Sequence, residues 1–211
     1  MKKIFIFIVA TVTIFATDFS EALVSYNGND HTKAFNSFYI LADKGEAKAQ
    51  YNIGVLYARG EGTKKDLLQA QIWYEKSAKQ GNPPAQYNLG KMYHNEGKYD
   101  ANSYKKAKYW YEKAIQSEVP QAYNNLAVLY RDGLGVETNN QKALELFEES
   151  ANMGDSSAQV NVAILYAWGE GIKQDQMKAY ENLKKALKSG EDKANKYISK
   201  LCKESAWVCK D

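Results

Sequence analysis

The chain has 211 residues, a formal net charge of +3, 25% charged and 45% hydrophobic residues, and three prolines. This composition is typical of an ordinary folded protein rich in helix, and it argues against disorder. Because positive and negative charges nearly balance, we expect no nucleic acid partner.

The N-terminal segment has the pattern of a secretory signal peptide. The basic start Met1–Lys3 precedes an uncharged apolar run over residues 4–15, which ends at the small residue Ala16. The run is too short for a comfortable transmembrane span and no second one follows, which favours a cleaved leader over an anchor. We therefore predict a leader over residues 1–16, with a later cut near Ala22 as the alternative. The mature chain is expected to be exported, periplasmic or secreted, and without a membrane span.

After the leader, the chain repeats itself with a period of 36 or 37 residues. The segment AQYNIG at Ala49–Gly54 returns as AQYNLG at Ala85–Gly90, as AYNNLA at Ala122–Ala127 and as AQVNVA at Ala158–Ala163. A second series of alanines has the same spacing: Ala34, Ala70, Ala107, Ala143 and Ala179. Each alanine of the second series lies in an apolar run with helical spacing. Each repeat is therefore predicted to consist of two helices.

Polar residues and glycines mark the expected ends of these helices. Four residues before each second-series alanine stands a side chain that can accept a hydrogen bond from helix-start amides: Asp30, Asp66, Ser103, Asn139 and Asp175. Eleven residues after it stands a glycine able to stop the helix, namely Gly45, Gly81, Gly154 or Gly190, with Glu118 as the exception. Glycine pairs join the two helices of a unit at residues 60–62, 133–135 and 169–171. Small residues in the first helix should let neighbouring helices approach closely: Gly54, Gly90, Ala127 and Ala163.

The pattern A-x-x-N-L-G-x-x-Y, followed by G-x-G, D, K-A, W/F-Y/F and A-x-x-G, resembles the SEL-one-like repeat (SLR) family, whose repeats are tetratricopeptide-like. The resemblance runs from about Asp30 to Leu201. It implies an all-α protein, an α/α solenoid of stacked antiparallel helix pairs. We divide the chain into a tetratricopeptide-like capping unit (17–45), four SLR units (46–81, 82–118, 119–154 and 155–190) and a C-terminal capping helix (191–211).

Little in the sequence points to catalysis. The two histidines, His31 and His94, lack metal-ligand spacing, so we predict neither a metal site nor a cofactor. Residues 103–106 match the S-x-x-K motif of serine β-lactamases, but S-D-N and K-T-G are missing and a helix-capping role accounts for Ser103. We therefore predict no catalytic residue. The alternative is a β-lactam- or cell-wall-peptide-binding protein with weak β-lactamase-like activity, as the resemblance to some secreted cysteine-rich SLR proteins implies.

Two cysteines, Cys202 and Cys209, lie close together near the C-terminus. In an oxidising compartment they can form a local disulfide that fastens a C-terminal cap over the last helix. The resemblance implies a cysteine pair in nearly every unit of a cysteine-rich SLR protein. This chain has one pair, so it departs from that group.

The concave face of the solenoid is the expected binding surface, because side chains there are free of core packing. Helical geometry and the resemblance to tetratricopeptide proteins place it on the first helix of each pair: Tyr51, Asn52, Val55, Tyr87, Asn88, Lys91, His94, Asn124, Asn125, Val128, Arg131, Asn161 and Ile164. The recurring asparagines, Asn52, Asn88, Asn125 and Asn161, can bind a peptide backbone or join adjacent repeats. Tyrosine, asparagine and scattered basic side chains suit a protein or peptide partner in the cell envelope or outside the cell. We expect a monomeric interaction scaffold.

Overall fold

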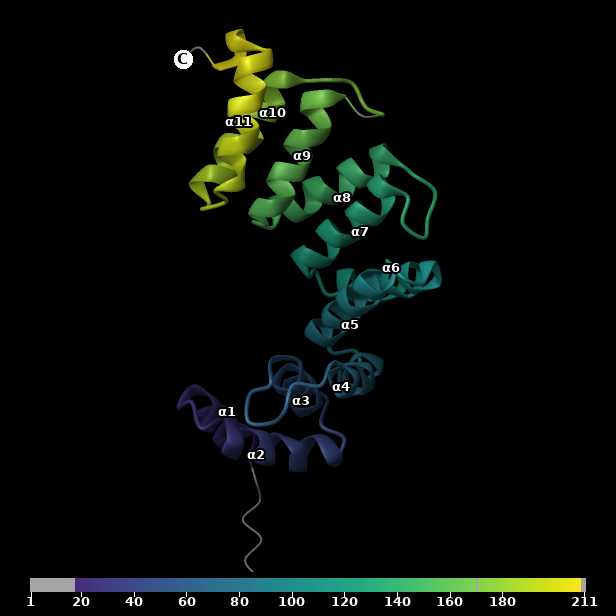
Figure 1. The fold of residues 1–211 in the computed structure, drawn as a ribbon, viewed down its shortest axis with the longest axis vertical. Coiled ribbons are helices and arrows are strands. Elements are labelled where there is room, and N and C mark those ends of the chain that lie inside the picture. The colour runs from purple at the N-terminus through teal and green to yellow at the C-terminus, as the bar shows by residue number, and fades with distance from the viewer. Residues whose placement is uncertain (1–17, 170, 210–211) are drawn as a thin grey trace, which may run out of the picture.

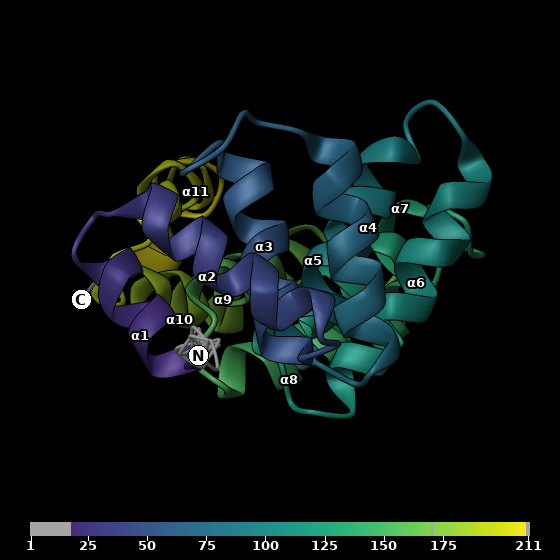
Figure 2. The same cartoon turned by 90° about the horizontal axis from the view of Figure 1, so that it is seen from below.

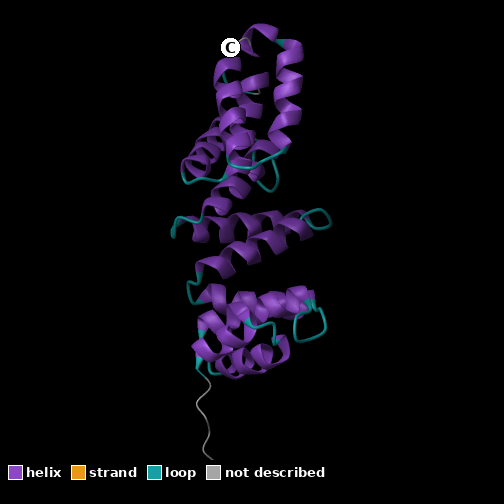
Figure 3. Ribbon diagram, turned by 90° about the vertical axis from the view of Figure 1, so that its left-hand side faces the viewer, coloured by secondary structure: helices purple, strands orange, loops and turns teal. Residues whose placement is uncertain are grey.

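The computed structural model describes residues 18–169 and 171–209, so the predicted leader at residues 1–16 lies outside the described residues. Within the described part every regular element is a helix and no strand occurs (Figure 3). The expected all-α class is therefore confirmed.

The helices pack in consecutive pairs that follow one another along the long axis of the molecule (Figure 1). The pairs are α1 (Phe19–Asn27) with α2 (His31–Asp43), α3 (Ala47–Arg59) with α4 (Leu67–Lys79), α5 (Pro83–Glu96) with α6 (Ala101–Ile115), α7 (Pro120–Asp132) with α8 (Asn140–Asn152), and α9 (Ser156–Trp168) with α10 (Gln176–Lys188). The final α11 (Lys193–Glu204) and the short 3-10 helix η1 (Ala206–Cys209) close the stack. In Figure 2 the last helices lie beside α1 and α2 in projection, away from α4 and α6, so the stack twists as it rises. This arrangement is the predicted α/α solenoid.

Side-chain caps begin the second helices where the sequence predicted them, with one exception. Asp30, Asp66, Asn139 and Asp175 each accept a hydrogen bond from the backbone N–H three residues later. The prediction for Ser103 was wrong, because Asp100 caps α6 and accepts from the N–H of Asn102 at 3.0 Å. Since the α5–α6 connection is short, α6 begins earlier and Ser103 lies within its first turn, 2% exposed.

The stop position after each second helix has a left-handed backbone. The glycines predicted there have φ values of +94° (Gly45), +85° (Gly81), +93° (Gly154) and +84° (Gly190). Glu118, the exception in the sequence, holds the same conformation with φ +54°. Because a Cβ is disfavoured in this region, Glu118 is a strained copy of a position built for glycine.

Small residues in the first helices leave room for a large ring from the second helix. A Cβ added to Gly54 would lie 2.6 Å from the ring of Tyr74, and one added to Gly90 would lie 2.7 Å from the ring of Tyr111. Both rings are buried, Tyr111 completely. The close approach expected from the sequence is therefore present in the first two SLR units.

Hydrogen bonds with a repeating geometry stabilise the contacts between helices. The hydroxyl of Ser77 on α4 donates to the carbonyl of Ala47 at 2.6 Å, and the hydroxyl of Ser150 on α8 donates to the carbonyl of Pro120 at 2.8 Å. The amide of Gln50 donates to the carbonyl of Ala42 in the preceding unit at 3.2 Å. These bonds satisfy polar groups that packing between helices would otherwise strand away from water.

The C-terminal cap contains the expected disulfide between Cys202 of α11 and Cys209 of η1, with Cα atoms 5.7 Å apart. Val208 is turned inward and is buried against the last core cluster, whereas Trp207 is 61% exposed. The indole N–H of Trp168 on α9 donates to the Glu204 carboxylate at 3.2 Å, which fixes α11 over the final pair. Among the residues described, none of the helices is long and apolar enough to cross a membrane.

Candidate functional site

Three adjoining cavities run along the first helices of the stack, and together they form what we call the groove. The central cavity, of about 450 Å³, lies between α3 and α5, and its lining includes Tyr51, Val55, Asn88 and Lys91. A second cavity, of about 200 Å³, extends from α3 toward Tyr26 of α1 and shares Tyr51 and Val55 with the central one. The third, of about 240 Å³, extends toward α7 and shares Lys91. The groove therefore crosses three consecutive repeats.

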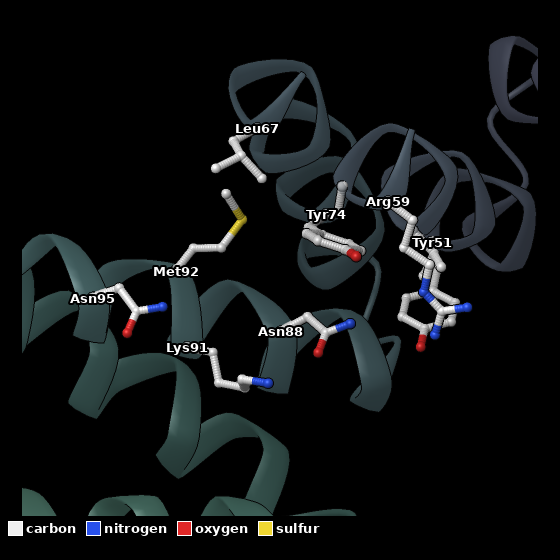
Figure 4. Close-up of a pocket in the computed structure, with 10 residues that line it drawn as sticks. Tyr51, Arg59, Leu67, Tyr74, Asn88, Lys91, Met92 and Asn95 are labelled. Atoms are coloured by element: carbon white, nitrogen blue, oxygen red, sulfur yellow. The ribbon is translucent and has the colours of Figure 1, made fainter. Parts of the chain in front are cut away.

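Figure 4 shows how the central cavity is built. Tyr51 and Arg59 come from α3 on one side, Asn88 and Lys91 come from α5 on the other, and the ring of Tyr74 lies between the two helices. Because α3 and α5 occupy equivalent places in adjacent repeats, the helix stacking itself brings their side chains together.

The electrostatic character of the groove is basic. The charged groups that line its three cavities are Arg59, Lys91 and the ionisable His94, and no carboxylate is among the lining residues of the described chain. Arg59 is partly neutralised, since its guanidinium lies 3.7 Å from the Glu61 carboxylate and donates to the Tyr26 hydroxyl at 2.9 Å. The ammonium of Lys91 instead lies over the Tyr87 ring, 5.5 Å from its centroid. Lys91 is thus the main positive group that the groove offers to a ligand.

None of the thirteen residues predicted for the concave face is buried. The cavities bring together seven of them: Tyr51, Asn52, Val55, Asn88, Lys91, His94 and Asn125. The other six are on α5, α7 and α9 outside these cavities, and all are partly exposed: Tyr87, Asn124, Val128, Arg131, Asn161 and Ile164. Whether these residues bind a partner stays a prediction.

The recurring asparagines form hydrogen bonds that connect helices of neighbouring units. Asn125 on α7 donates to the hydroxyl of Tyr111 on α6 at 3.4 Å. Asn88 makes the equivalent contact with the Tyr74 hydroxyl, and burial raises the pKa of both tyrosines, which therefore stay neutral donors and acceptors. Asn161 on α9 donates to the side-chain oxygen of Asn124 at 2.8 Å. The sequence left two roles open for these asparagines, binding a peptide backbone or joining adjacent repeats. The structure shows direct hydrogen bonds for the second role.

His94 lies where the groove passes from α5 toward α7. Its Nδ1 is 3.4 Å from the Tyr111 hydroxyl, and its ring packs edge-on against Tyr104. Burial lowers the pKa of His94, with a smaller contribution from the positive charge of Lys98 and an opposing one from Asp132. At neutral pH the ring is therefore an uncharged hydrogen-bonding group.

Sequence reasoning missed several residues that line the central cavity. Arg59 and Asn95 lie ten residues after the first-helix alanine, one beyond the position of His94, and Met92 lies seven after it, one beyond the position of Lys91. Leu67 comes from a second helix, which the prediction left out altogether. The available signal was the missing glycine pair after α5. A short connection there leaves the start of α4, including Leu67, exposed to solvent.

The side chains considered from the sequence for metal binding or catalysis are His31, His94 and Ser103. In the part of the chain that the structure describes, no group of three or more His, Cys, Asp or Glu side chains is placed to hold a metal ion. The hydroxyl of Ser103 is turned toward the Asp100 carboxylate at 3.3 Å, and the residue is buried. A bulky acyl substrate has no access to that oxygen in this conformation.

Solved structures with the same fold are close in shape. A Sel1 repeat protein from Oxalobacter formigenes is 27% identical, with a TM-score of 0.77 over 89% of this chain and 79% of that one. The protein c5321, a protective antigen of uropathogenic Escherichia coli strains displaying an SLR fold, is also 27% identical, with a TM-score of 0.76 over 88% of this chain and 40% of that one. An immunity protein of Pseudomonas aeruginosa, Pa5087, is 20% identical with a TM-score of 0.54 over 82% of this chain and 68% of that one, and so shows the fold alone.

Among curated proteins, the rat and mouse forms of DAP3-binding cell death enhancer 1 are each 49% identical to this chain over 41 residues. The match spans 19% of this chain and 8% of those proteins, about the length of one repeat.

The Sel1 repeat family model matches four consecutive segments, residues 47–82, 83–118, 120–155 and 156–191. These segments cover α3 to α10, which include the three first helices along which the groove runs, α3, α5 and α7. Sel1 repeats are in general scaffolds for protein–protein interaction. The chain therefore belongs to the Sel1 repeat family.

Proposed function

We propose that this protein is an extracytoplasmic scaffold that binds a partner protein or peptide along the groove. The observation that carries the proposal is the row of three adjoining cavities on α3, α5 and α7, lined mostly by side chains that the core does not bury. A long shallow surface of this kind suits an extended polypeptide better than a small metabolite, whose sites are usually enclosed.

The composition of the groove supports a polypeptide partner. Tyr51 and Val55 of the groove, and Tyr87, whose ring lies against the Lys91 ammonium beside it, offer rigid or apolar contact area, which costs little side-chain entropy on binding. Side-chain amides such as Asn52 can pair with peptide groups of a bound chain. The asparagines that also join repeats hold the surface in one shape before the partner arrives, and preorganisation of this kind favours affinity.

Export is the second part of the proposal. The pattern of residues 1–16 is that of a signal peptide, and the disulfide of Cys202 with Cys209 is favoured in an oxidising compartment. The similar c5321 protein of uropathogenic Escherichia coli strains is a protective antigen, which is consistent with export.

The first helix also bears on where the leader is cut. Asp18 caps α1, the ring of Phe19 packs against Phe38 with centroids 5.4 Å apart, and Ala22 is fully buried. A cut near Ala22 would remove these contacts from the capping unit. We therefore favour cleavage close to Ala16 over the later alternative.

The experiment has two readouts. Fractionation of cells that produce the full chain, with mass spectrometry of the mature N-terminus, should find a processed form outside the cytoplasm that begins near residue 17. Affinity capture with this form should recover a partner that a variant combining Tyr51→Ala, Asn52→Ala and Tyr87→Ala no longer retains. The matched control is a variant with Tyr39→Ala, Lys76→Ala and Tyr109→Ala on the second helices. An unprocessed cytoplasmic protein would contradict export, and a partner retained by the groove variant would contradict the binding surface.

A further inference from the structure

In most of the stack, the loop between the two helices of a unit covers the start of the second helix in the unit before it. The second glycine of each pair makes this contact, because a side chain there would meet the covered residue: Gly62 on His31, Gly135 on Tyr104 and Gly171 on Asn140. His31, Tyr104 and Asn140 stand at the start of α2, α6 and α8, and all three are partly buried.

The unit formed by α5 and α6 has no such loop. Its connection, residues 97–100, is four residues long, whereas the α3–α4 connection spans the seven residues 60–66. The helix start that it should cover belongs to α4, where Leu67 occupies the place of His31, Tyr104 and Asn140 in the repeat. Leu67 is therefore 55% exposed and the next residue, Leu68, is 66% exposed.

A mainly apolar cleft of about 410 Å³ fills the place of the missing loop. Its lining includes Leu67 and Leu68 of α4, Met92 and Glu96 of α5, and Tyr99 of the short connection, which is 94% exposed. Single exposed apolar residues are normal on a protein surface, but several gathered around one hollow indicate a contact site. We call this hollow the α4 cleft.

The α4 cleft continues into the basic part of the groove. Leu67, Met92 and Asn95 line both the cleft and the central cavity, in which Lys91 stands (Figure 4). No carboxylate of the described residues lies within ion-pair distance of the Lys91 ammonium, which lies over the Tyr87 ring. Glu96 is the acidic group of the cleft, so a ligand carboxylate is attracted toward Lys91 and repelled from the outer end.

We propose that the α4 cleft receives a large apolar side chain of a partner protein segment, and that Lys91 binds a carboxylate of the same segment. This inference rests on the proposed function of the groove and adds the chemistry of the ligand: an acidic segment with an apolar anchor. Burial of the anchor supplies affinity, and the charge pair fixes which way the segment runs.

The test is a selection of random dodecapeptides, displayed on phage, against the mature full-length chain. We expect enriched peptides to combine Leu, Ile, Met or Phe with a nearby Asp or Glu. A synthetic peptide from this set should bind about tenfold more weakly to Leu68→Asp, a loss of about 1.4 kcal/mol. Selection against Lys91→Glu should replace the acidic residue by Lys or Arg.

Two controls match these variants. Val24→Asp places the same charge on a similarly exposed apolar residue of α1, and Lys76→Glu reverses a charge on α4 away from the groove. Both should leave peptide affinity unchanged. Circular dichroism checks that each variant is folded.

A loop graft tests the cause of the cleft. Replacing residues 96–103 by the sequence of residues 60–66 restores the glycine pair and should cover Leu67 and Leu68. The grafted protein is expected to keep the preference for acidic peptides, through Lys91, and to lose the preference for an apolar anchor.

The possible failures are distinguishable. Peptides that ignore Leu68→Asp and Lys91→Glu but lose affinity in His94→Ala would overturn the inference and leave the groove as a binding surface. Absence of any enrichment would count against both the inference and the proposed function. If Leu68→Asp converts a sedimenting dimer into a monomer, the cleft is occupied by a second copy and the inference is wrong.

Discussion

The side-chain amide of Asn161 on α9 donates a hydrogen bond of 2.8 Å to the side-chain oxygen of Asn124 on α7, across 37 residues of sequence. The oxygen of Asn161 accepts in turn from Arg131 at 3.3 Å, and Asn124 donates to Asn125 at 3.3 Å. Polar side chains of the predicted concave face therefore join two repeats while still reaching solvent.

This relationship predicts that Asn161 and Asn124 are energetically coupled. Asn161→Ala should lower the free energy of unfolding by about 1 kcal/mol, the usual net value of one hydrogen bond. Asn124→Ala should cost a similar amount, and the double variant should cost less than the two losses combined. Urea denaturation of the four proteins measures the coupling. Strict additivity would show that the contact contributes nothing to stacking.

Gly90 is predicted to be intolerant of a side chain. Gly90→Ala would force a methyl group to within 2.7 Å of the Tyr111 ring, and overpacking of this kind costs about 1 to 3 kcal/mol. The next two units carry alanine here, at Ala127 and Ala163. Their residues in register with Tyr111 are Phe147 and Leu183.

The loss should shrink when the ring is removed. In a Tyr111→Leu background, which reproduces the pairing of Ala163 with Leu183, Gly90→Ala is expected to cost less than in the parent. Equal losses in both backgrounds, measured by thermal denaturation, would show that the Tyr111 ring is not the obstacle.

Glu118 offers a site where substitution should stabilise the protein. Its φ of +54° lies in the left-handed region, which costs a residue with a Cβ about 1 to 2 kcal/mol. Glu118→Gly should raise the free energy of unfolding by about 0.5 to 1 kcal/mol after the greater chain entropy of glycine is subtracted. The opposite change at the equivalent site, Gly81→Ala, has no steric obstacle within 4 Å and should destabilise through the backbone alone. Chemical denaturation compares the two, and a stability loss in Glu118→Gly would contradict the explanation.

The stability of the fold should depend on pH through His94. Burial, supported by the positive charge of Lys98, holds the pKa of His94 in the native state below 6.5, the value expected for the unfolded chain. Between the native pKa and 6.5 the unfolded chain therefore binds more protons than the native one. The contribution of the neutral ring is complete above pH 6.5, and it is lost as the pH falls through the native pKa. Below the native pKa the ring is protonated in both states, so it causes no further loss of stability.

The measurement is the melting temperature at about pH 7.5 and about pH 5.5, for the parent and for His94→Gln. The parent should lose more stability on acidification than the variant, because the variant has no imidazole to protonate. A parent and variant that respond equally would remove His94 as the cause.

The fold could be predicted from the sequence because the same residue pattern, and so the same helix pair, recurs in several units. Alanines at fixed spacing mark both helices, and caps such as Asp66 and Asp175 recur with them. The one wrong cap, Ser103, lies in the unit that departs from the pattern, where a short connection lets Asp100 begin α6 earlier. Register transfers well between units of equal length and fails where the length changes.

The candidate site was less predictable than the fold. Helical spacing selected Tyr51, Asn88 and Lys91, which the structure brings into one cavity. Helical spacing did not select Leu67. That residue is exposed because the next unit along the chain, α5 with α6, lacks the loop that would cover it. Such an effect joins two units, so it emerges from the stacking and cannot be assigned from the period of a single unit.

The most direct test of the account is a map of where a partner touches the solenoid. The photocrosslinking amino acid p-benzoylphenylalanine would replace Tyr51 or Tyr87 on the groove face, and Tyr39 or Tyr109 on the second helices, where those tyrosines are exposed. Irradiation of cells that naturally make the protein should give covalent adducts with a partner at Tyr51 and Tyr87 and none at Tyr39 and Tyr109. Adducts at Tyr39 and Tyr109 alone would contradict the claim that the groove is the surface through which this protein acts.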